Sequence, residues 1–248
     1  MKRRKFLQTT GALSAGAVLP WPGLERLPTP DSRPSAPGSP GTTILFQGDS
    51  ITDCGRDRTV AGENAASALG NGYPLLIASR LLAERAEAGY RFFNRGVSGN
   101  TVPDCDARWQ TDTLVLAPDV LSILIGVNDY WHTLNGGYKG TADDYEHQFT
   151  ALLARTRTAL PKVRLVILEP FTLRTGVITD SWFPAFDERR KIARRVADAA
   201  GAKFLGTQDL FDRLSRQAPP VYWASDGVHP TAAGHGAIAD LWMEAVGL

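Results

Sequence analysis

Residues 44–55 read ILFQGDSITDCG, and the change of character within this stretch indicates how the fold begins. A short apolar run, typical of a buried strand, ends at Gly48 and is followed at once by Asp49, Ser50 and Thr52. Serine readily caps the helix that follows a strand, so a purely structural explanation exists. Alternatively, the end of the strand presents Ser50 as a nucleophile. The rest of the sequence has to decide between these two interpretations.

Beyond this stretch, apolar strand-like runs alternate with segments of helical periodicity. Such alternation favours parallel pairing, because each crossover returns the chain to the same edge of one sheet. Right-handed crossovers then predict a three-layer α/β/α sandwich with a five-stranded parallel sheet, built by one domain. The expected strands cover residues 43–48, 90–96, 120–126, 163–170 and 202–207, and the expected helices cover residues 72–89, 141–160, 186–201 and 231–246.

Composition excludes two classes of partner. The 248 residues carry a formal net charge of +1, but residues 1–41 hold six basic and two acidic side chains. The totals of 27 basic and 26 acidic residues therefore leave 21 and 24, a net charge of −3, for the remainder. A mildly acidic domain predicts no nucleic-acid partner. No run of about 18 apolar residues occurs, so we expect no stable membrane anchor.

The N-terminus reads as an address followed by a linker. Residues 1–19 begin with Arg3 and Arg4, continue with Lys-Phe-Leu and end in a Gly/Ala-rich run, which resembles a twin-arginine export signal. Residues 20–41 contain seven prolines and are predicted to be a linker before a single domain at 42–248. The sequence therefore predicts an exported protein, periplasmic or extracellular.

Polar residues follow the ends of three expected strands, in the segments FQGDS, NRGVSGN and LIGVND. The carboxyl ends of parallel strands share one sheet edge, where ligands bind. Ser50 would be a nucleophile there, with His229 as its base and Asp226 as the residue that orients the imidazole. The amides of Ser50 and Gly96 and the side chain of Asn128 would donate to an oxyanion. Each residue alone has an ordinary structural explanation; together they favour acyl transfer.

The motifs GDSIT, RGVSGN, GVND and DGVHP resemble the four blocks of the SGNH (GDSL-type) hydrolase family, and they occur in the family's order. The resemblance spans residues 43–248. It implies a flavodoxin-like sandwich that hydrolyses esters through a serine acyl-enzyme, with no metal and no other cofactor. The first block ends in isoleucine rather than leucine, a conservative difference.

Carried over position by position, the resemblance implies five site residues. Ser50 would be the nucleophile and one oxyanion donor, and Gly96 and Asn128 would complete the oxyanion hole. His229 would act as the base, oriented by Asp226.

Three features favour an acetylated carbohydrate as the substrate. Residues 130–144 are aromatic and polar, whereas a site for long acyl chains should be continuously apolar. Tyr130, Trp131 and Trp223 lie near expected strand ends, where flat rings can stack on sugars and bind substrate. The blocks are also similar to those of bacterial acetylxylan esterases of the family. The expected substrate is thus a small-molecule or polysaccharide acetyl ester, such as xylan or its oligosaccharides.

Several alternatives stay open from the sequence. The enzyme alternative is a broad-specificity lipase or lysophospholipase-type carboxylesterase, and the non-enzyme alternative is a carbohydrate-binding protein on the same scaffold. Trp182 also lies near an expected strand-end loop, but for Trp182 and Trp109 core or rim packing is as well supported as a contact with substrate. A homo-oligomer is neither required nor excluded.

The charged residues around Ser50 have more modest interpretations. Arg56 and Arg58 could bind an anionic substituent, although surface ion pairs are the favoured explanation. Asp49 and Asp53 are expected to brace the turn through backbone hydrogen bonds.

The remaining histidines and the cysteines suggest no additional centre. His132, His147 and His235 show no metal-ligand spacing, so no metal is assigned. Cys54 and Cys105 both follow expected strand ends; free thiols are the favoured state, with a disulfide as the alternative in an exported protein.

Overall fold

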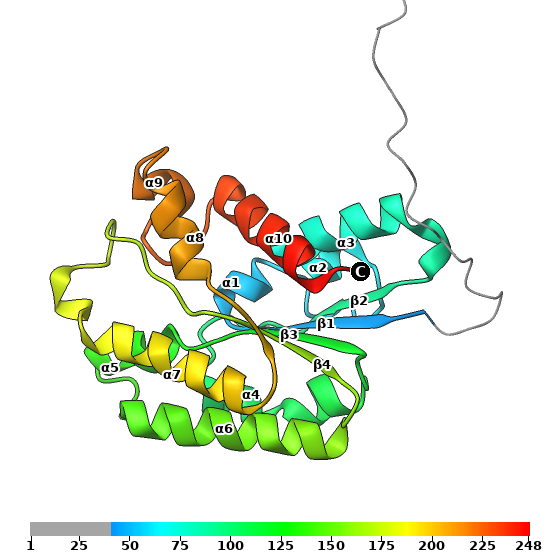
Figure 1. Ribbon diagram of the computed structural model, residues 1–248, viewed down its shortest axis with the longest axis horizontal. Helices are drawn as coiled ribbons and strands as arrows, with labels where there is room; N and C mark the ends of the chain where they lie inside the picture. Colours follow the sequence, from blue (N-terminus) through cyan, green and yellow to red (C-terminus); the bar gives the residue numbers. More distant parts are fainter. Residues whose placement is uncertain (1–40) are drawn as a thin grey trace, which may run out of the picture. The chain divides into compact units, whose positions relative to one another are not determined.

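The computed structural model describes residues 41–248, which form a five-stranded sheet with helices on both faces (Figure 1). All four strand pairings are parallel, and the strand order is β2-β1-β3-β4-β5. This doubly wound order is the flavodoxin-like one, so the sequence-based fold class is confirmed. The strands are β1 (Thr43–Gly48), β2 (Arg91–Asn94), β3 (Val120–Leu124), β4 (Arg164–Leu168) and β5 (Lys203–Leu205).

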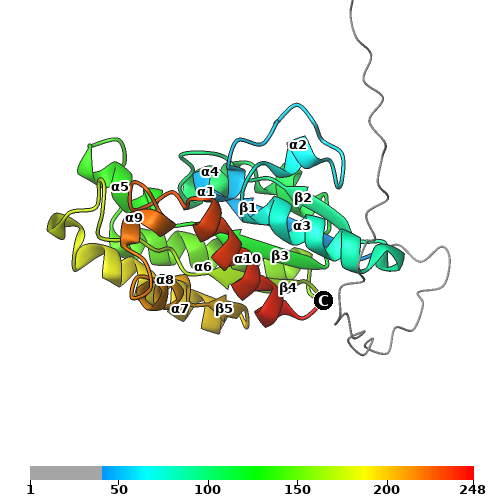
Figure 2. The ribbon, with the colours of Figure 1, turned by 90° about the horizontal axis from the view of Figure 1, so that it is seen from above.

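Helices pack on the two faces of this sheet as separate groups. In Figure 1, α3 and α10 lie above the sheet and α4, α6 and α7 lie below it, and Figure 2 shows α3 and α10 running side by side. The helices are α1 (Ser50–Asp53), α2 (Ala66–Leu69), α3 (Tyr73–Glu84), α4 (Val102–Ala107), α5 (Asn128–Leu134), α6 (Ala142–Ala159), α7 (Ala185–Ala199), α8 (Thr207–Leu214), α9 (Pro220–Trp223) and α10 (Ala232–Val246).

Alternation along the central strands explains the two layers. Ile44 and Phe46 of β1 enter a core cluster that contains Trp242 of α10, whereas Leu45 enters a second cluster that contains Phe149 of α6. Successive side chains of a strand point to opposite faces. A strand that is buried on both faces must therefore be apolar throughout, as residues 43–46 nearly are.

The elements differ from the expected ones mainly at their ends. The second and third strands end two residues before Gly96 and Gly126, because the chain leaves the sheet ahead of these glycines. The helix expected over residues 72–89 ends at Glu84, and a separate 3₁₀ turn, Ala86–Ala88, follows. The sequence did not predict the helices α2, α4, α5, α8 and α9, all of which are short.

The expected export signal and almost all of the expected linker lie outside the described residues. Among residues 41–248, no helix is long and apolar enough to cross a membrane.

Candidate active site

Ser50 lies where β1 turns sharply into α1. Gly48 has φ of 151°, and a Cβ there would lie 2.2 Å from the carbonyl oxygen of Leu124, so only glycine fits this turn. Asp49 is the residue that caps α1, since its Oδ1 accepts a hydrogen bond from the Ile51 amide at 3.0 Å. Ser50 therefore occupies the first helical position rather than the cap, and its amide has no acceptor within the helix.

The side chains of Ser50, His229 and Asp226 form one hydrogen-bonded chain. Ser50 Oγ lies 2.8 Å from His229 Nε2, and His229 Nδ1 lies 2.6 Å from Asp226 Oδ2. An aspartate oxygen opposite Nδ1 keeps the proton on that nitrogen, which leaves Nε2 free to accept the serine hydrogen. Partial burial opposes ionisation, but the hydrogen bonds from His229 hold the pKa of Asp226 below its ordinary value.

Backbone contacts fix the segment that carries this histidine and aspartate. Asp226 Oδ1 accepts the amides of Val228 and His229 at 2.9 and 2.7 Å, so the carboxylate braces its own turn. The Asp226 carbonyl accepts the amide of Val177 at 3.0 Å. The loop after β4 also approaches Asp226 closely. A Cβ at Gly176 in this loop would lie 2.4 Å from Asp226 Cα, which explains why the position is a glycine.

Asn128 begins α5, directly after β3. Its Nδ2 donates one hydrogen bond to the carbonyl of Asn100 at 3.1 Å, which leaves the second hydrogen of the amide available. The expected position of this side chain at the sheet edge is therefore observed.

Gly96 is not placed as an oxyanion donor. Its buried amide already donates to Asn94 Oδ1 at 2.9 Å. A Cβ at this position would lie 2.4 Å from the amide nitrogen of Asp53, so the glycine serves the close packing of the chain on α1. The sequence-based role of Gly96 as a donor is thus wrong, because the side chain of Asn94 occupies its N–H.

Gly99, three residues after Gly96, has the free amide that an oxyanion donor needs and that Gly96 lacks. Its φ is +84°, no atom lies within 4 Å of a Cβ built there, and its amide donates no hydrogen bond within residues 41–248. The flanking residues tie it to the site: Ser98 donates to Asp53, and Asn100 accepts from Asn128. The motif NRGVSGN contains both glycines, and nothing in the sequence pattern distinguishes the one with a free amide.

Two further carboxyl groups lie buried beside the site. Asp49 precedes Ser50, and Asp129 follows Asn128 and accepts the amide of Val102 at 2.9 Å. Each has one carboxyl oxygen, Oδ2, that is buried and has no hydrogen-bond partner. Burial raises the pKa of each of these two carboxyl groups to about 7. The expectation that Asp49 braces the turn is confirmed by its bond to the backbone.

Asp53 and the neighbouring arginines form a small network. Asp53 Oδ2 accepts the amide and hydroxyl of Ser98 and pairs with the half-exposed Arg58. Burial opposes ionisation of Asp53, but its bond to Arg58 and those to Ser98 lower its pKa. The prediction that Arg56 forms an ion pair at the surface is wrong. Its side chain is buried, and its Nε donates a hydrogen bond to the Gly96 carbonyl at 2.7 Å.

The aromatic residues separate into one at the site and several in the core. The half-buried ring of Trp131 lies 6.2 Å from the His229 ring, centroid to centroid. Tyr130 is only 6 % exposed, and its ring lies beneath the Arg189 guanidinium. The expectation that Tyr130 stacks on substrate is therefore wrong, because its neighbours already cover the ring.

The other tryptophans have distinct surroundings. Trp109 and Trp182 are buried in the core. Trp223 is half-buried, and its Nε1 is directed at the carbonyls of Leu214 and Ala218, both at 3.2 Å. The polar edge of Trp223 thus faces the protein, and any contact with substrate would use the ring face.

Both cysteines are free thiols. Cys54 Sγ lies 3.3 Å from His235 Nε2, whereas the buried Cys105 lies against Arg108. These separate partners agree with the favoured expectation of two unbridged thiols.

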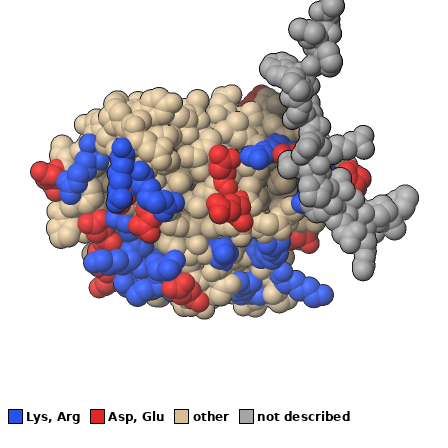
Figure 3. Space-filling view, turned by 45° about the horizontal axis from the view of Figure 1, so that its top comes forward, with Lys and Arg blue, Asp and Glu red and all other residues tan. Residues whose placement is uncertain are grey.

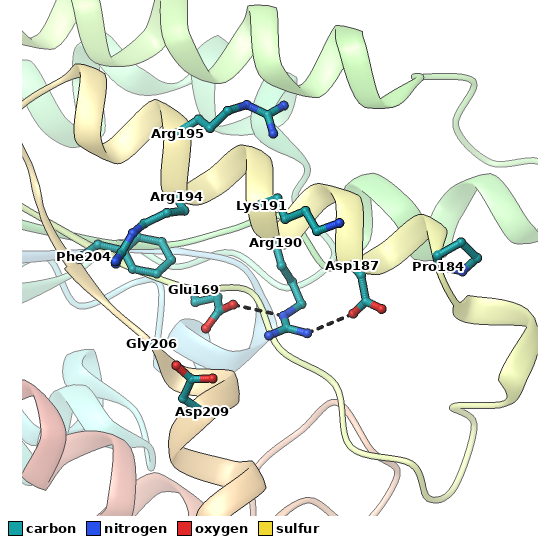
Figure 4. A pocket seen from close by; sticks show the side chains of 10 residues that line it. All are labelled: Glu169, Pro184, Asp187, Arg190, Lys191, Arg194, Arg195, Phe204, Gly206 and Asp209. Carbon is teal, nitrogen blue, oxygen red and sulfur yellow. Dashed lines mark hydrogen bonds and ion pairs between the residues drawn. The ribbon is translucent and has the colours of Figure 1, made fainter.

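A cavity of about 680 Å³ lies between α7, β5 and α8, away from this constellation (Figure 4). None of Ser50, Asp226 and His229 lines it. Arg190 in its wall donates to both Glu169 and Asp187, at 3.0 and 2.9 Å. Acidic side chains are interleaved with basic ones on the face shown in Figure 3 as well. The other basic side chains of the wall, Lys191, Arg194 and Arg195, pair with acidic residues beside the cavity, so the positive charges of the wall are compensated.

A doubly wound α/β sandwich that brings a serine, a histidine and an aspartate into one hydrogen-bonded chain at its carboxyl edge has the arrangement of serine-type hydrolases. The model of the GDSL-like lipase/acylhydrolase family matches residues 46–237 of this chain. The chain belongs to this family and is a carboxylic ester hydrolase. The resemblance drawn from its four sequence blocks is confirmed.

Individual relatives extend over most of the chain. It is 35% identical to an acetylxylan esterase of Geobacillus stearothermophilus over 84% of this chain and 94% of that protein. A solved GDSL-like protein of Parabacteroides merdae is 50% identical, with a TM-score of 0.82, covering 84% of this chain and 96% of that one. The α/β hydrolase LAE5 from the Lake Arreo metagenome is 35% identical, with a TM-score of 0.77 and coverages of 84% and 96%.

Proposed function

We propose that this enzyme removes O-acetyl groups from carbohydrate, such as xylan or its oligosaccharides, through a Ser50–His229–Asp226 triad and an acetyl-enzyme. The observation that carries the mechanism is the hydrogen-bonded chain from Ser50 Oγ through the imidazole to the Asp226 carboxylate, with separations of 2.8 and 2.6 Å. A serine hydroxyl becomes a useful nucleophile at neutral pH only when such a base accepts its proton.

In the first half-reaction, Ser50 Oγ attacks the acetyl carbonyl carbon while His229 Nε2 takes the serine proton. The carboxylate of Asp226 stabilises the imidazolium that forms. His229 then gives this proton to the sugar oxygen, and the bond between that oxygen and the acetyl carbon breaks. The sugar leaves with a free hydroxyl, and the acetyl group remains on Ser50. In the second half-reaction, His229 Nε2 takes a proton from water, whose oxygen attacks the acetyl carbon. The bond between that carbon and Ser50 Oγ then breaks, His229 returns the proton to Oγ, and acetate leaves with the Ser50 hydroxyl restored.

Three donors from three strand ends are assigned to the oxyanion of each tetrahedral intermediate. They are the amide of Ser50, the amide of Gly99 and the second hydrogen of Asn128 Nδ2, all of which lack acceptors within residues 41–248. Donors held in place before the reaction stabilise the developing charge with little reorganisation. Gly99 replaces Gly96 in this set because the Gly96 amide is already bound to Asn94.

The acetylated-carbohydrate assignment rests on two observations. Trp131 presents a half-buried ring beside His229, where an indole can cover the apolar face of a pyranose. The acetylxylan esterase of Geobacillus stearothermophilus is a relative across nearly its whole length. We retain Trp223 as a proposed substrate-binding residue, which would use its ring face. Tyr130 is no longer proposed to bind substrate.

The assay that tests this function compares acyl chain lengths. Acetate, butyrate and octanoate esters of 4-nitrophenol should be hydrolysed with decreasing kcat/KM, and acetylated xylan should release acetate. Preference for octanoate would instead favour the lipase or lysophospholipase alternative. Ser50→Ala should abolish turnover of every ester, and a Ser50→Ala protein with wild-type activity would exclude this mechanism.

A non-catalytic carbohydrate-binding role is not favoured. A binding module has no use for a serine that shares its proton with a carboxylate-bound histidine, yet this arrangement is complete here. Export remains a separate proposal: the paired arginines and the Gly/Ala-rich run of residues 1–19 favour delivery to the periplasm or beyond.

A further inference from the structure

A sulfur–imidazole contact joins the helix of the nucleophile to the helix that follows the base. Cys54, the residue that terminates α1, places its Sγ 3.3 Å from Nε2 of His235, in the first turn of α10. The second ring nitrogen of His235, Nδ1, accepts the amide of Tyr73 at 3.2 Å. One imidazole therefore contacts the ends of α1 and α3 while its own backbone belongs to α10.

These contacts determine the protonation of the pair. Because Nδ1 accepts a hydrogen bond from Tyr73, the proton of the neutral imidazole is on Nε2 and is donated to Cys54 Sγ. Burial and then the charge of nearby His229 lower the pKa of His235 to about 4, so the ring is neutral at neutral pH. Burial raises the pKa of the Cys54 thiol. The sulfur therefore acts as a hydrogen-bond acceptor, not as a second nucleophile.

The contact lies one helical turn from the reacting groups. Cys54 follows Ser50 by four residues at the other end of α1, and His235 follows His229 by six residues. Two side-chain contacts thus span the same pair of segments, one between Ser50 and His229 and one between Cys54 and His235. A shift of α10 relative to α1 would change both separations together.

Gly72 shows that the surrounding chain makes room for this contact. A Cβ at Gly72 would lie 2.9 Å from Cys54 Cβ and 2.9 Å from His235 Cε1. Its backbone is extended, with φ of −109°, a conformation that any residue adopts. The glycine is therefore explained by the space that the two side chains occupy and not by backbone strain.

We propose that Cys54 and His235 are positioning residues of the esterase, which hold α1 and the start of α10 at the separation that the Ser50–His229 hydrogen bond requires. The proposal rests on the proposed triad. Displacement of a reacting group by a fraction of an ångström to 1 Å lowers the rate of the chemical step far more than it lowers ground-state binding. The signature is therefore a fall in kcat with little change in KM.

Gly72→Ala tests the proposal without changing the chemical identity of either partner, because the added methyl group would lie 2.9 Å from an atom of each and would have to displace them. Gly236→Ala is the matched control: Gly236 follows His235 in α10, and no atom lies within 4 Å of a Cβ built there. With 4-nitrophenyl acetate, Gly72→Ala should lower kcat about tenfold at a KM within about twofold of wild type. Gly236→Ala should retain the wild-type kcat. Equal kcat values for the two variants would overturn the proposal.

The second pair of variants changes the acceptor itself. Cys54→Ala leaves the buried Nε2–H of His235 without a partner and should lower kcat about tenfold, whereas Cys54→Ser keeps an acceptor and should recover most of the loss. Thermal unfolding is measured for each variant. If kcat of Cys54→Ser is no higher than that of Cys54→Ala, or if both lose only thermal stability, the contact has no positioning role. Residual turnover by Ser50→Ala, measured in parallel, would instead indicate failure of the triad.

Discussion

At the residue scale, the two buried carboxyl groups of Asp49 and Asp129 carry the clearest pH signature. Both flank residues of the proposed site, and both have a buried oxygen without a hydrogen-bond partner. Burial raises their pKa from an ordinary value of 3.8 to about 7. The folded protein therefore binds more protons than the unfolded chain between these values, so this contribution to stability is complete at low pH and is lost as the pH rises through about 7.

Asp129→Asn removes one of these titrations while keeping an oxygen that can accept the amide of Val102. We expect the free energy of unfolding of the variant, relative to that of wild type, to increase as the pH rises from 4 to 8. The increase should be roughly 2–4 kcal/mol if most of the pKa shift of Asp129 is expressed. Urea denaturation at pH 4, 6 and 8 measures the difference. The depressed pKa of His235 acts with the opposite sign below pH 6.5 but is common to both proteins. An unchanged difference in unfolding free energy across this range would contradict the expectation.

The two glycines of the second block should respond differently to alanine. Gly96→Ala forces a Cβ to within 2.4 Å of the Asp53 backbone and should mainly destabilise the fold. Gly99→Ala meets open space, so the fold should survive, but alanine is strained at φ of +84° and the amide should turn away from the oxyanion. We expect kcat to fall about tenfold or more for Gly99→Ala, with a smaller loss of melting temperature than in Gly96→Ala. Wild-type kcat in Gly99→Ala would contradict the assignment of the Gly99 amide as an oxyanion donor.

At the element scale, sequence periodicity predicted the strands and the long helices well. The apolar run of residues 120–124 predicted a buried strand and forms β3, which is buried throughout; the parallel order follows from the helices between the strands. The polar residues after β1 and β3 were therefore expected at one sheet edge, where the structure has them. Sequence separation did not obscure this arrangement, because the topology brings the strand ends together.

What sequence could not predict are the local hydrogen bonds that decide between similar residues. Gly96 and Gly99 are equivalent in the pattern until the Asn94 side chain takes one amide. Tyr130 and Trp131 are adjacent, but consecutive helical residues point about 100° apart, so only one of them faces His229. The role of Cys54 depends on a partner 181 residues away, which no local pattern contains.

Trp131, in the first turn of α5, is the residue whose replacement tests the proposed binding of sugar rings. Trp131→Ala should raise KM for acetylated xylo-oligosaccharides several-fold, to the order of tenfold, because the loss of a stacking ring costs about 1 kcal/mol. Turnover of 4-nitrophenyl acetate, which has no sugar ring, should change much less. Tyr130→Phe is the neighbouring control and should leave both KM values unchanged. Parallel losses on the two substrates in Trp131→Ala would argue against a sugar platform.

At the scale of the whole molecule, charge is divided along the chain. Residues 1–41 carry six basic and two acidic side chains, a net charge of +4, whereas the remainder carries a net charge of −3. This division suits the proposed terminal address, which is read by a receptor and not by the folded domain.

Replacement of the arginine pair tests the address. Arg3→Lys together with Arg4→Lys keeps the positive charge and should retain the enzyme in the cytoplasm, because a twin-arginine signal is read by residue type. Fractionation of cells followed by an esterase assay measures the result. Unchanged secretion of the double variant would refute this route.

The central claim is that Ser50 is the nucleophile and that His229 activates it. Its most direct measurement is labelling with a phosphonate ester that reacts only with an activated serine, followed by peptide mass spectrometry. One label should appear on the peptide that contains Ser50, none should appear in Ser50→Ala, and His229→Ala should react at least about a hundredfold more slowly. A label on another residue, or undiminished labelling of His229→Ala, would contradict the account.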